Sequence, residues 1–254
     1  NLKKKIIGIW ITLEIIILQH ISIEDPGYIK DLMLSDGFNL TTIELDNGEK
    51  IPKNLNEFDA MFCMGGPMDT WMEEKYPWLV EEKKRIREFV VDLKKPFLGF
   101  CLGCQLLGEV VGGKVVKSDP AEIGMLDIDF SKSKEKDIIF SSFPKKIKAL
   151  QWHSYEVIDL ENNKNITLLA SSLTTKYQIF KYKNHAYGIQ FHIEVKDTTV
   201  NDWGCVPAYK SALEAQFGDG ALKKFDQEAK ANMKQMNSLS TILYSKFKNK
   251  ILGI

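Results

Sequence analysis

The stretch Pro96-Phe97-Leu98-Gly99-Phe100-Cys101-Leu102-Gly103-Cys104-Gln105-Leu106-Leu107 contains the feature around which we expect the fold to be organised. An apolar run of strand length, Phe97 to Phe100, ends at Cys101, and a helix-compatible run from Leu102 to Val111 begins at once. Glycines stand two residues before and after the cysteine, where larger side chains would block the close backbone approach of a tight turn. The pattern predicts a nucleophile elbow, with a cysteine at a helix N-terminus whose dipole favours the thiolate.

A purely structural interpretation of the stretch is also open, because free cysteine is among the most buried residue types. A second stretch, Ala186 to Glu194, favours catalysis: it is strand-like and ends with His192 and Glu194. At the strand period of two, these side chains point to the same face, and a carboxylate there orients the imidazole and stabilises its protonated form. We therefore expect a catalytic triad made of Cys101, His192 and Glu194.

Together, Gly-x-Cys-x-Gly-x-Gln and Gly-x-Gln-Phe-His-x-Glu resemble the motifs of the class I glutamine amidotransferases of the triad type. The stand-alone members similar to the amidotransferase part of GMP synthase look closest. The resemblance covers nearly the whole chain and implies an α/β fold of the flavodoxin-like class I amidotransferase kind. This is an open, mostly parallel sheet flanked by helices, with a small antiparallel subsheet and a helical C-terminal tail. We expect one domain over residues 1–254, with a catalytic core at 14–200 and a helical extension at 201–254.

The resemblance also implies an oxyanion hole. Gly65-Gly66-Pro67 follows a strand-like run and on its spacing alone would be a simple turn. The family places half of its oxyanion hole at this point. The resemblance therefore implies that the amide of Gly66, or of Gly65, acts together with the amide of Leu102. Two such preorganised donors stabilise a developing oxyanion.

Substrate contacts are implied on two segments. Gln105 lies one helical turn beyond Cys101 and faces the same side. The segment Gln151-Trp152-His153-Ser154-Tyr155 resembles the family's His-Ser segment, and we expect Ser154 and Tyr155 to contact the substrate. By itself, the histidine of this segment would be a packed or surface residue.

The implied function is hydrolysis of the γ-amide of glutamine or of a γ-glutamyl compound through a γ-glutamyl thioester, with release of ammonia or an amine. We expect no cofactor, and no metal because no Cys/His cluster has zinc spacing. The sequence contains no Ser-Gly-Gly-x-Asp-Ser loop of an ATP-binding synthetase. Either a separate synthetase subunit receives the ammonia, or the protein is a free γ-glutamyl amide or peptide hydrolase. A catalytically silent regulatory or binding subunit is a third hypothesis, and the intact triad argues against it.

The composition limits the kinds of binding partner and the cellular compartment that we expect. Lys and Arg together number 34, as do Asp and Glu, so the formal net charge is zero and favours neither nucleic acid nor an anionic membrane. Four cysteines make a poor disulfide framework, which favours the cytoplasm. Lys3-Lys4-Lys5 and the following apolar run look like a signal peptide, but Glu14 interrupts the run and it is shorter than the ~20 residues that a bilayer needs. We interpret residues 1–13 as an extra strand or extension.

Two motifs near the elbow suggest other chemistry. Cys101-Leu102-Gly103-Cys104 has thioredoxin-like spacing, but Cys104 is more simply a small packing residue. Gly108 to Lys114 fits Gly-x4-Gly-Lys, yet it lacks the following Ser or Thr and ends a helix instead of following a strand, so we reject a phosphate-binding loop.

The sequence departs from the family pattern at two positions. Ile193 replaces the usual Pro, and Met125 stands where an aromatic residue is common, which implies a different entrance to the site.

The remaining pattern predicts local structure. A long amphipathic helix is expected over residues 79–93. Several short β segments, among them 115–116, 125–130 and 147–152, are expected between residues 114 and 187. Three helices are expected in the tail, and their apolar stripe predicts core packing. The stripe consists of Phe225, Met233, Met236, Tyr244 and Phe247.

Overall fold

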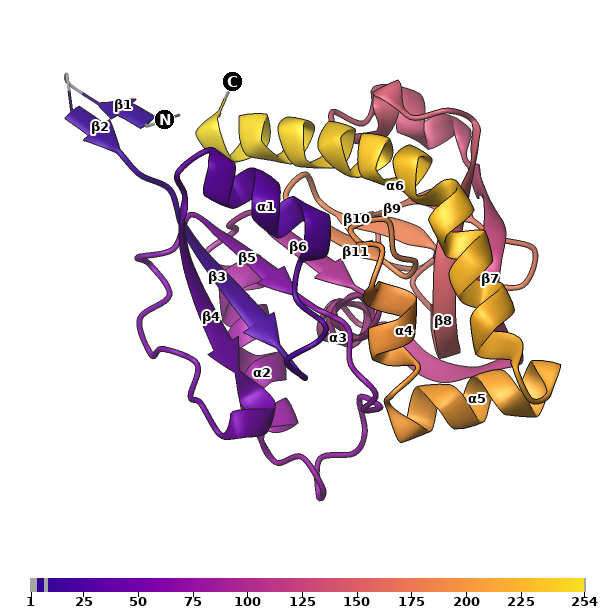
Figure 1. Cartoon of the computed structure of the whole chain (residues 1–254). Coiled ribbons are helices and arrows are strands. Elements are labelled where there is room, and N and C mark those ends of the chain that lie inside the picture. The colour runs from indigo at the N-terminus through magenta and orange to yellow at the C-terminus, as the bar shows by residue number, and fades with distance from the viewer. Residues whose placement is uncertain (1–3, 7–8, 254) are drawn as a thin grey trace.

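One nine-stranded sheet forms the centre of the computed structural model, which describes residues 4–6 and 9–253 (Figure 1). Its strand order is β4-β3-β5-β6-β11-β10-β9-β7-β8. The neighbours from β4 to β11 run parallel, and the remaining pairs are antiparallel. The expected parallel sheet with an antiparallel part is thus confirmed. The strands are β3 Glu14–Gln19, β4 Asn39–Glu44, β5 Ala60–Cys63, β6 Phe97–Phe100, β7 Lys114–Phe130, β8 Lys146–Ile158, β9 Ile166–Ser171, β10 Ile179–Tyr182 and β11 Ala186–Ile189.

Apolar residues on both faces explain why the parallel strands lie at the centre. In β3, Ile15 and Ile17 pack into one core cluster, and Ile16 and Leu18 pack into the other. Alternate side chains of a strand point to opposite faces, so a continuous apolar run requires a cover on each side. Helices α1 and α6 cover one face, and α2 and α3 cover the other (Figure 1). The helices are α1 Gly27–Ser35, α2 Trp78–Arg87, α3 Leu102–Val110, α4 Thr199–Trp203, α5 Pro207–Phe217 and α6 Ala221–Leu252.

The antiparallel part differs from the expectation of several short segments. Residues 115–116 and 125–130 belong to one strand, β7, which pairs with β8 along its length. The register shifts between Lys117 and Glu122, where charged residues and Pro120 interrupt the alternating pattern. The sequence shows an interruption there, but the backbone ladder continues through a bulge.

Helix lengths also differ from the expectation. The helix expected at 79–93 is α2 up to Arg87 and continues as a π-helical turn, Glu88–Asp92. The two helices expected after Gly220 are one 32-residue helix, α6, because no Gly or Pro interrupts it. The apolar stripe of the tail is buried in the core, as expected. Short 3₁₀ turns are η1 Leu45–Asn47, η3 Lys132–Lys136 and η4 Phe140–Ser142.

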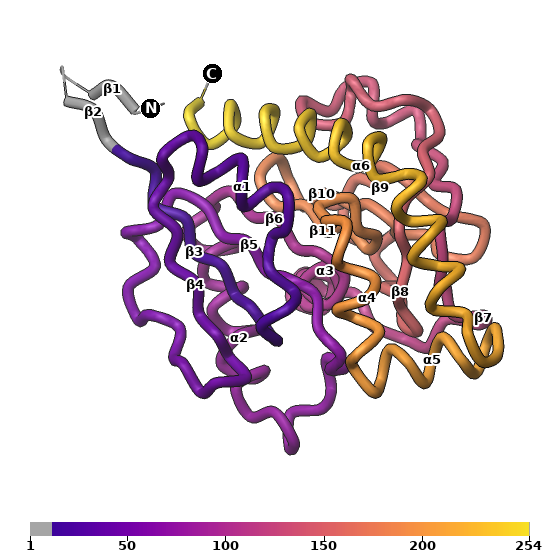
Figure 2. Tube along the Cα trace, in the orientation of Figure 1, coloured from indigo at the N-terminus to yellow at the C-terminus, as the bar shows by residue number. Residues whose placement is uncertain are grey.

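The tail runs across the molecule. Figure 2 shows α6 starting beside α5 and passing over the sheet to α1. At the other end of the chain, β1 Lys4–Ile6 pairs antiparallel with β2 Ile9–Ile11 in a separate two-stranded sheet, so the extra strand expected in residues 1–13 is a pair of strands. The core boundary at residue 200 stays a prediction. In the described part of the chain, no helix combines the length and apolar character needed to cross a membrane.

Candidate active site

Cys101 lies on a tight turn between β6 and α3. Its backbone φ of 48° and ψ of −103° are strained for a residue with a side chain. A Cβ on Gly103 would lie 2.1 Å from the carbonyl oxygen of Cys63, and one on Gly99 would lie 2.4 Å from the carbonyl oxygen of Gly103. Both glycines are therefore required by backbone that passes directly against them. The cysteine is 6% exposed and starts the helix.

His192 and Glu194 lie side by side, and His192 also contacts Cys101. Nδ1 of His192 is 2.6 Å from Oε1 of Glu194, and both side chains are buried. Burial lowers the pKa of His192, but the charge of Glu194 and the contacts with Glu194 and Cys101 outweigh it and raise that pKa well above its ordinary value. Because Nδ1 faces the carboxylate, Nε2 is the nitrogen left for the thiol. The structure thus brings the three residues expected as a triad together.

Ile193 contributes a contact to this pair. Its backbone N–H donates to Oε2 of Glu194 at 2.9 Å. A proline, which the resemblance leads one to expect here, has no N–H to donate. The departure therefore adds a hydrogen bond to the carboxylate and removes no reacting group.

Distant segments hold the backbone around His192. Its N–H donates to the carbonyl of Leu150 at 2.8 Å, and its carbonyl accepts from the N–H of Leu150 at 3.2 Å. The indole of Trp203, from α4, meets the imidazole edge to face with 4.6 Å between ring centres. The histidine is therefore fixed from β8 on one side and from the tail on the other.

The next two residues are held in the same way. The N–H of Tyr28, in α1, donates to the carbonyl of Glu194 at 2.6 Å. The hydroxyl of Ser240, in α6, donates to the carbonyl of Ile193 at 2.7 Å and is fully buried. A Cβ on Gly27 would lie 2.1 Å from the Glu194 carbonyl oxygen, so the start of α1 packs directly on this segment.

A cleft of about 240 Å³ opens at the cysteine. Among its lining residues are six of the expected site residues: Cys101, Leu102, Gly66, Gln105, Ser154 and Tyr155. Gly65 does not line it, and its carbonyl instead accepts from His20 Nδ1 at 2.9 Å. Of the two glycines expected for the oxyanion hole, Gly66 is thus the one on the cleft. Its role stays a prediction.

Comparisons with known proteins identify the family of the chain. The model of the glutamine amidotransferase class I family matches residues 28–202. The chain belongs to this family. It is 27% identical to the glutamine amidotransferase-like protein YfeJ of Salmonella typhimurium, over 86% of this chain and 90% of YfeJ. It is 29% identical to a glutamine-hydrolysing GMP synthase subunit of Sulfurisphaera tokodaii, over 77% of this chain and 92% of that protein.

Solved structures of glutamine amidotransferases show the same fold. A crystal structure from Thermotoga maritima superimposes with a TM-score of 0.80 at 28% identity, covering 95% of this chain and 99% of that one. A second, from Methylobacillus flagellatus, has a TM-score of 0.79 at 20% identity and covers 94% of this chain and 95% of that one. The fold class expected from the motifs is thereby confirmed.

Within this amidotransferase fold, Gln105 is already engaged with protein groups. Its side-chain amide donates to the carbonyl of Tyr155 at 3.0 Å and to Oε1 of Gln190 at 3.2 Å. The residue therefore ties α3 to the strand that forms the opposite wall of the cleft. A contact of its carbonyl oxygen with substrate stays a prediction.

His153 anchors the same wall. Its Nε2 lies 3.0 Å from Oε2 of Glu122, and its Nδ1 lies 2.9 Å from the carbonyl of Tyr155. Burial raises the pKa of Glu122, but hydrogen bonds from His153, Ser172 and Thr174 outweigh it and lower that pKa to about 2. An ionised carboxylate thus fixes the wall from β7, and the histidine is a packed residue in this wall.

The sequence reasoning missed residues that the tail brings to the cleft. Ala208, Tyr209 and Ala212 of α5 line it. The hydroxyl of Tyr209 donates to Glu24, a buried residue of the loop before α1. Burial raises the pKa of Glu24 to about 7 against the effects of this bond and of His192. No local pattern links Glu24 to Tyr209, so only the folded chain shows the pair.

Cys104 differs from its neighbour in the Cys-x-x-C pattern. It is fully buried, and burial, followed by the proximity of Cys101, raises the pKa of its thiol well above the ordinary value. A protonated, inaccessible thiol is a poor redox group. The packing role expected for it agrees with this environment.

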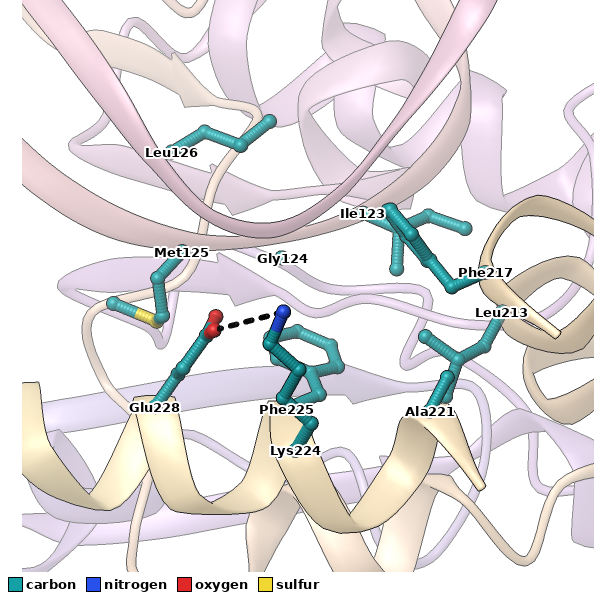
Figure 3. Close-up of a pocket in the computed structure, with 10 residues that line it drawn as sticks. All are labelled: Ile123, Gly124, Met125, Leu126, Leu213, Phe217, Ala221, Lys224, Phe225 and Glu228. Carbon is teal, nitrogen blue, oxygen red and sulfur yellow. Dashed lines mark ion pairs between the residues drawn. The ribbon is translucent and has the colours of Figure 1, made fainter. Parts of the chain in front are cut away.

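A second cavity, of about 290 Å³, lies between β7 and the two tail helices α5 and α6 (Figure 3). Ile123 and Met125 face Leu213 and Phe225 across it, and Lys224 and Glu228 pair at 3.9 Å on α6. Met125 lines this cavity and does not line the cleft at Cys101. The different entrance to the active site that Met125 implies stays a prediction.

Proposed function

We propose that the protein is a triad-type amidohydrolase that cleaves the γ-amide of glutamine or of a γ-glutamyl compound. The observation that carries the proposal is the buried His192–Glu194 pair, 2.6 Å apart, beneath a cysteine on a strained turn. A thiolate beside an imidazolium is the reactive form of such a pair. Family membership supports an amidohydrolase in general, and the residue roles that follow are our proposal.

The proposed reaction has two steps. The sulfur of Cys101 bonds to the carbonyl carbon of the γ-amide, and the carbon–nitrogen bond breaks as His192 gives its proton to the departing ammonia or amine. Water then adds to the carbonyl carbon of the thioester while His192 takes its proton. The carbon–sulfur bond breaks, which releases the γ-carboxyl group and restores the thiolate beside the imidazolium. Glu194 holds the imidazole throughout. The amides of Gly66 and Leu102 stabilise the oxyanion in both steps, and each such donor is typically worth about 3 kcal/mol.

The acceptor of the ammonia defines two versions of this proposal. The similarity to a glutamine-hydrolysing GMP synthase subunit favours a partner in the form of a separate synthetase. The alternative is a stand-alone γ-glutamyl amide or peptide hydrolase. The first version is supported if the protein co-purifies with a synthetase that needs this chain in order to use glutamine. The second is supported if the isolated protein hydrolyses γ-glutamyl peptides.

The first experiment measures intact mass after incubation with diazo-oxo-norleucine, with ammonia release from glutamine assayed in parallel. We expect one adduct on the wild type and none on Cys101→Ala, with ammonia release falling by at least about 10⁴-fold in that variant. Cys205→Ala is the matched control, because Cys205 is the exposed cysteine. It should retain both the adduct and the activity.

The other outcomes separate the hypotheses. An adduct at Cys101 without glutamine turnover indicates another γ-glutamyl substrate or a missing activating partner. A wild type that forms no adduct contradicts the mechanism. That result would favour the hypothesis of a catalytically silent regulatory or binding subunit.

A further inference from the structure

His20 lies directly behind the Gly65–Gly66 peptide. It follows β3, is fully buried, and its Nδ1 is 2.9 Å from the carbonyl oxygen of Gly65. A carbonyl oxygen only accepts, so Nδ1 carries the proton and donates it. A Cβ on Gly66 would lie 2.8 Å from the Cβ of His20, so the histidine packs against this peptide without any intervening group.

Because the peptide bond is planar, the contact of His20 with the Gly65 carbonyl also fixes the direction of the Gly66 N–H. In a trans peptide, the carbonyl of Gly65 and the N–H of Gly66 belong to one plane and point in opposite directions. Gly66 lines the cleft together with Cys101 and Leu102, whereas the Gly65 carbonyl is turned to the buried imidazole. Two consecutive glycines have little backbone preference of their own, so the orientation of this peptide needs an external anchor.

Glu82 makes that anchor rigid. Its Oε1 lies 2.9 Å from Nε2 of His20 and also accepts from the thiol of Cys63 at 3.4 Å, and all three side chains are fully buried. Trp78 stacks on the imidazole with 5.6 Å between ring centres. Burial lowers the pKa of His20, but the charge and hydrogen bond of Glu82 outweigh it, and the bond to Gly65 adds to them, so the pKa is raised. The imidazole is thus held in one orientation from α2.

We infer that His20, fixed by Glu82, is a positioning residue for the oxyanion hole: it holds the Gly65 carbonyl so that the Gly66 N–H points at the γ-carbonyl of the substrate. The inference rests on the proposed function, because it assigns how one of the two oxyanion donors is oriented. The oriented Gly66 N–H acts in the transition state, where the oxygen of the substrate's γ-carbonyl becomes negative. Loss of the anchor therefore lowers kcat and kcat/KM equally and leaves KM in place.

A pair of double variants tests the anchor. In His20→Phe with Glu82→Met, both partners become apolar groups of similar shape, which leaves no buried charge unpaired. In His20→Asn with Glu82→Met, the asparagine amide stands close to the position of Nδ1 and restores the donor to Gly65. His185→Phe is the matched control, because His185 also contacts a backbone carbonyl, that of Val90 at 2.8 Å, but lies outside the site.

We expect kcat to fall about 10²-fold in the phenylalanine variant and to recover to within about fivefold of wild type in the asparagine variant. KM should change by less than about twofold in both. Alkylation of Cys101 by iodoacetamide, which forms no oxyanion, should keep its wild-type rate. The control His185→Phe should keep its kcat.

A second readout needs no substrate. In a ¹⁵N-labelled sample, the Gly66 amide should give one resonance in the wild type and should broaden or split in the phenylalanine variant. A wild-type kcat together with an unchanged Gly66 resonance in that variant would overturn the inference. If the wild type releases no ammonia and also forms no adduct at Cys101, the proposed function fails, and the Gly66 resonance still decides on the anchor.

Discussion

The two halves of the proposed triad are built in different ways. The nucleophile elbow, residues 97–105, is specified by consecutive residues: a strand, a cysteine, a helix and two glycines where backbone passes within 2.4 Å of an added Cβ. The segment from His192 to Glu194 is held by residues from α1, β8, α4 and α6. The position of the nucleophile is thus a local property of the chain, and the position of the base is a property of the whole fold.

Among the variants that test this contrast, the one that removes the charge beside the base should have the largest effect. Glu194→Gln takes away the carboxylate that raises the pKa of His192. That pKa then falls, the imidazolium that stabilises the Cys101 thiolate is lost, and alkylation of Cys101 requires a higher pH. We expect ammonia release to fall by about 10³-fold or more. The measurements are kcat and the pH profile of iodoacetamide alkylation.

The control for this variant is the same exchange at the other buried His–Glu pair. Glu122→Gln disturbs the bond to His153, which is 3.0 Å long, but does not touch His192. It should leave the pH midpoint of alkylation in place. A Glu194→Gln variant with an unshifted midpoint would show that the carboxylate does not set the state of the imidazole.

A smaller effect is expected from a methyl group in the elbow. In Gly103→Ala, the new Cβ meets the Cys63 carbonyl oxygen at 2.1 Å, and backbone is not free to rotate away. We expect about 3 kcal/mol of lost unfolding free energy, the upper end of the usual overpacking cost. The thermal midpoint then falls by roughly 6–12 °C, which calorimetry measures.

Gly48→Ala is the control that separates the steric clash of an added Cβ from the backbone strain of replacing a glycine. This residue has nothing within 4 Å of an added Cβ, although its φ of 80° is strained for alanine. It should lose less stability than Gly103→Ala. If the two variants melt at the same temperature, close backbone packing does not define the elbow.

The smallest effect tests the remote support of the base. Ser240→Ala removes the hydroxyl that donates to the Ile193 carbonyl at 2.7 Å and leaves that carbonyl without its partner. We expect a loss of about 1–2 kcal/mol in unfolding free energy, and a fall in kcat of a few fold as the segment loosens. Ser238→Ala, an exposed serine on the same helix, should change stability by less than about 0.5 kcal/mol. If both serine variants lose the same unfolding free energy and the same kcat, the Ser240 contact does not support the base segment.

The contrast between the two halves also explains what sequence reasoning can reach. The elbow and the His192–Glu194 strand are visible because each is a short motif with a fixed period, and together they predicted the family and the fold. The continuity of β7 through residues 117–122 was not visible, because a bulged ladder looks like a break in the alternating pattern. Residues such as Trp203 and Tyr209 reach the site only through the path of the tail. Their helices look like ordinary amphipathic helices until that path is known.

The contact between Ser240 and Ile193 has a consequence for the order in which the protein becomes competent. During synthesis, at roughly 5–20 residues per second, the cysteine and histidine motifs leave the ribosome seconds before the helix that supports them. A nascent chain therefore holds every proposed reacting group while its base segment still lacks the Ser240 contact. We therefore expect the proposed site to reach its full activity only after α6 has folded back across the sheet and Ser240 contacts Ile193.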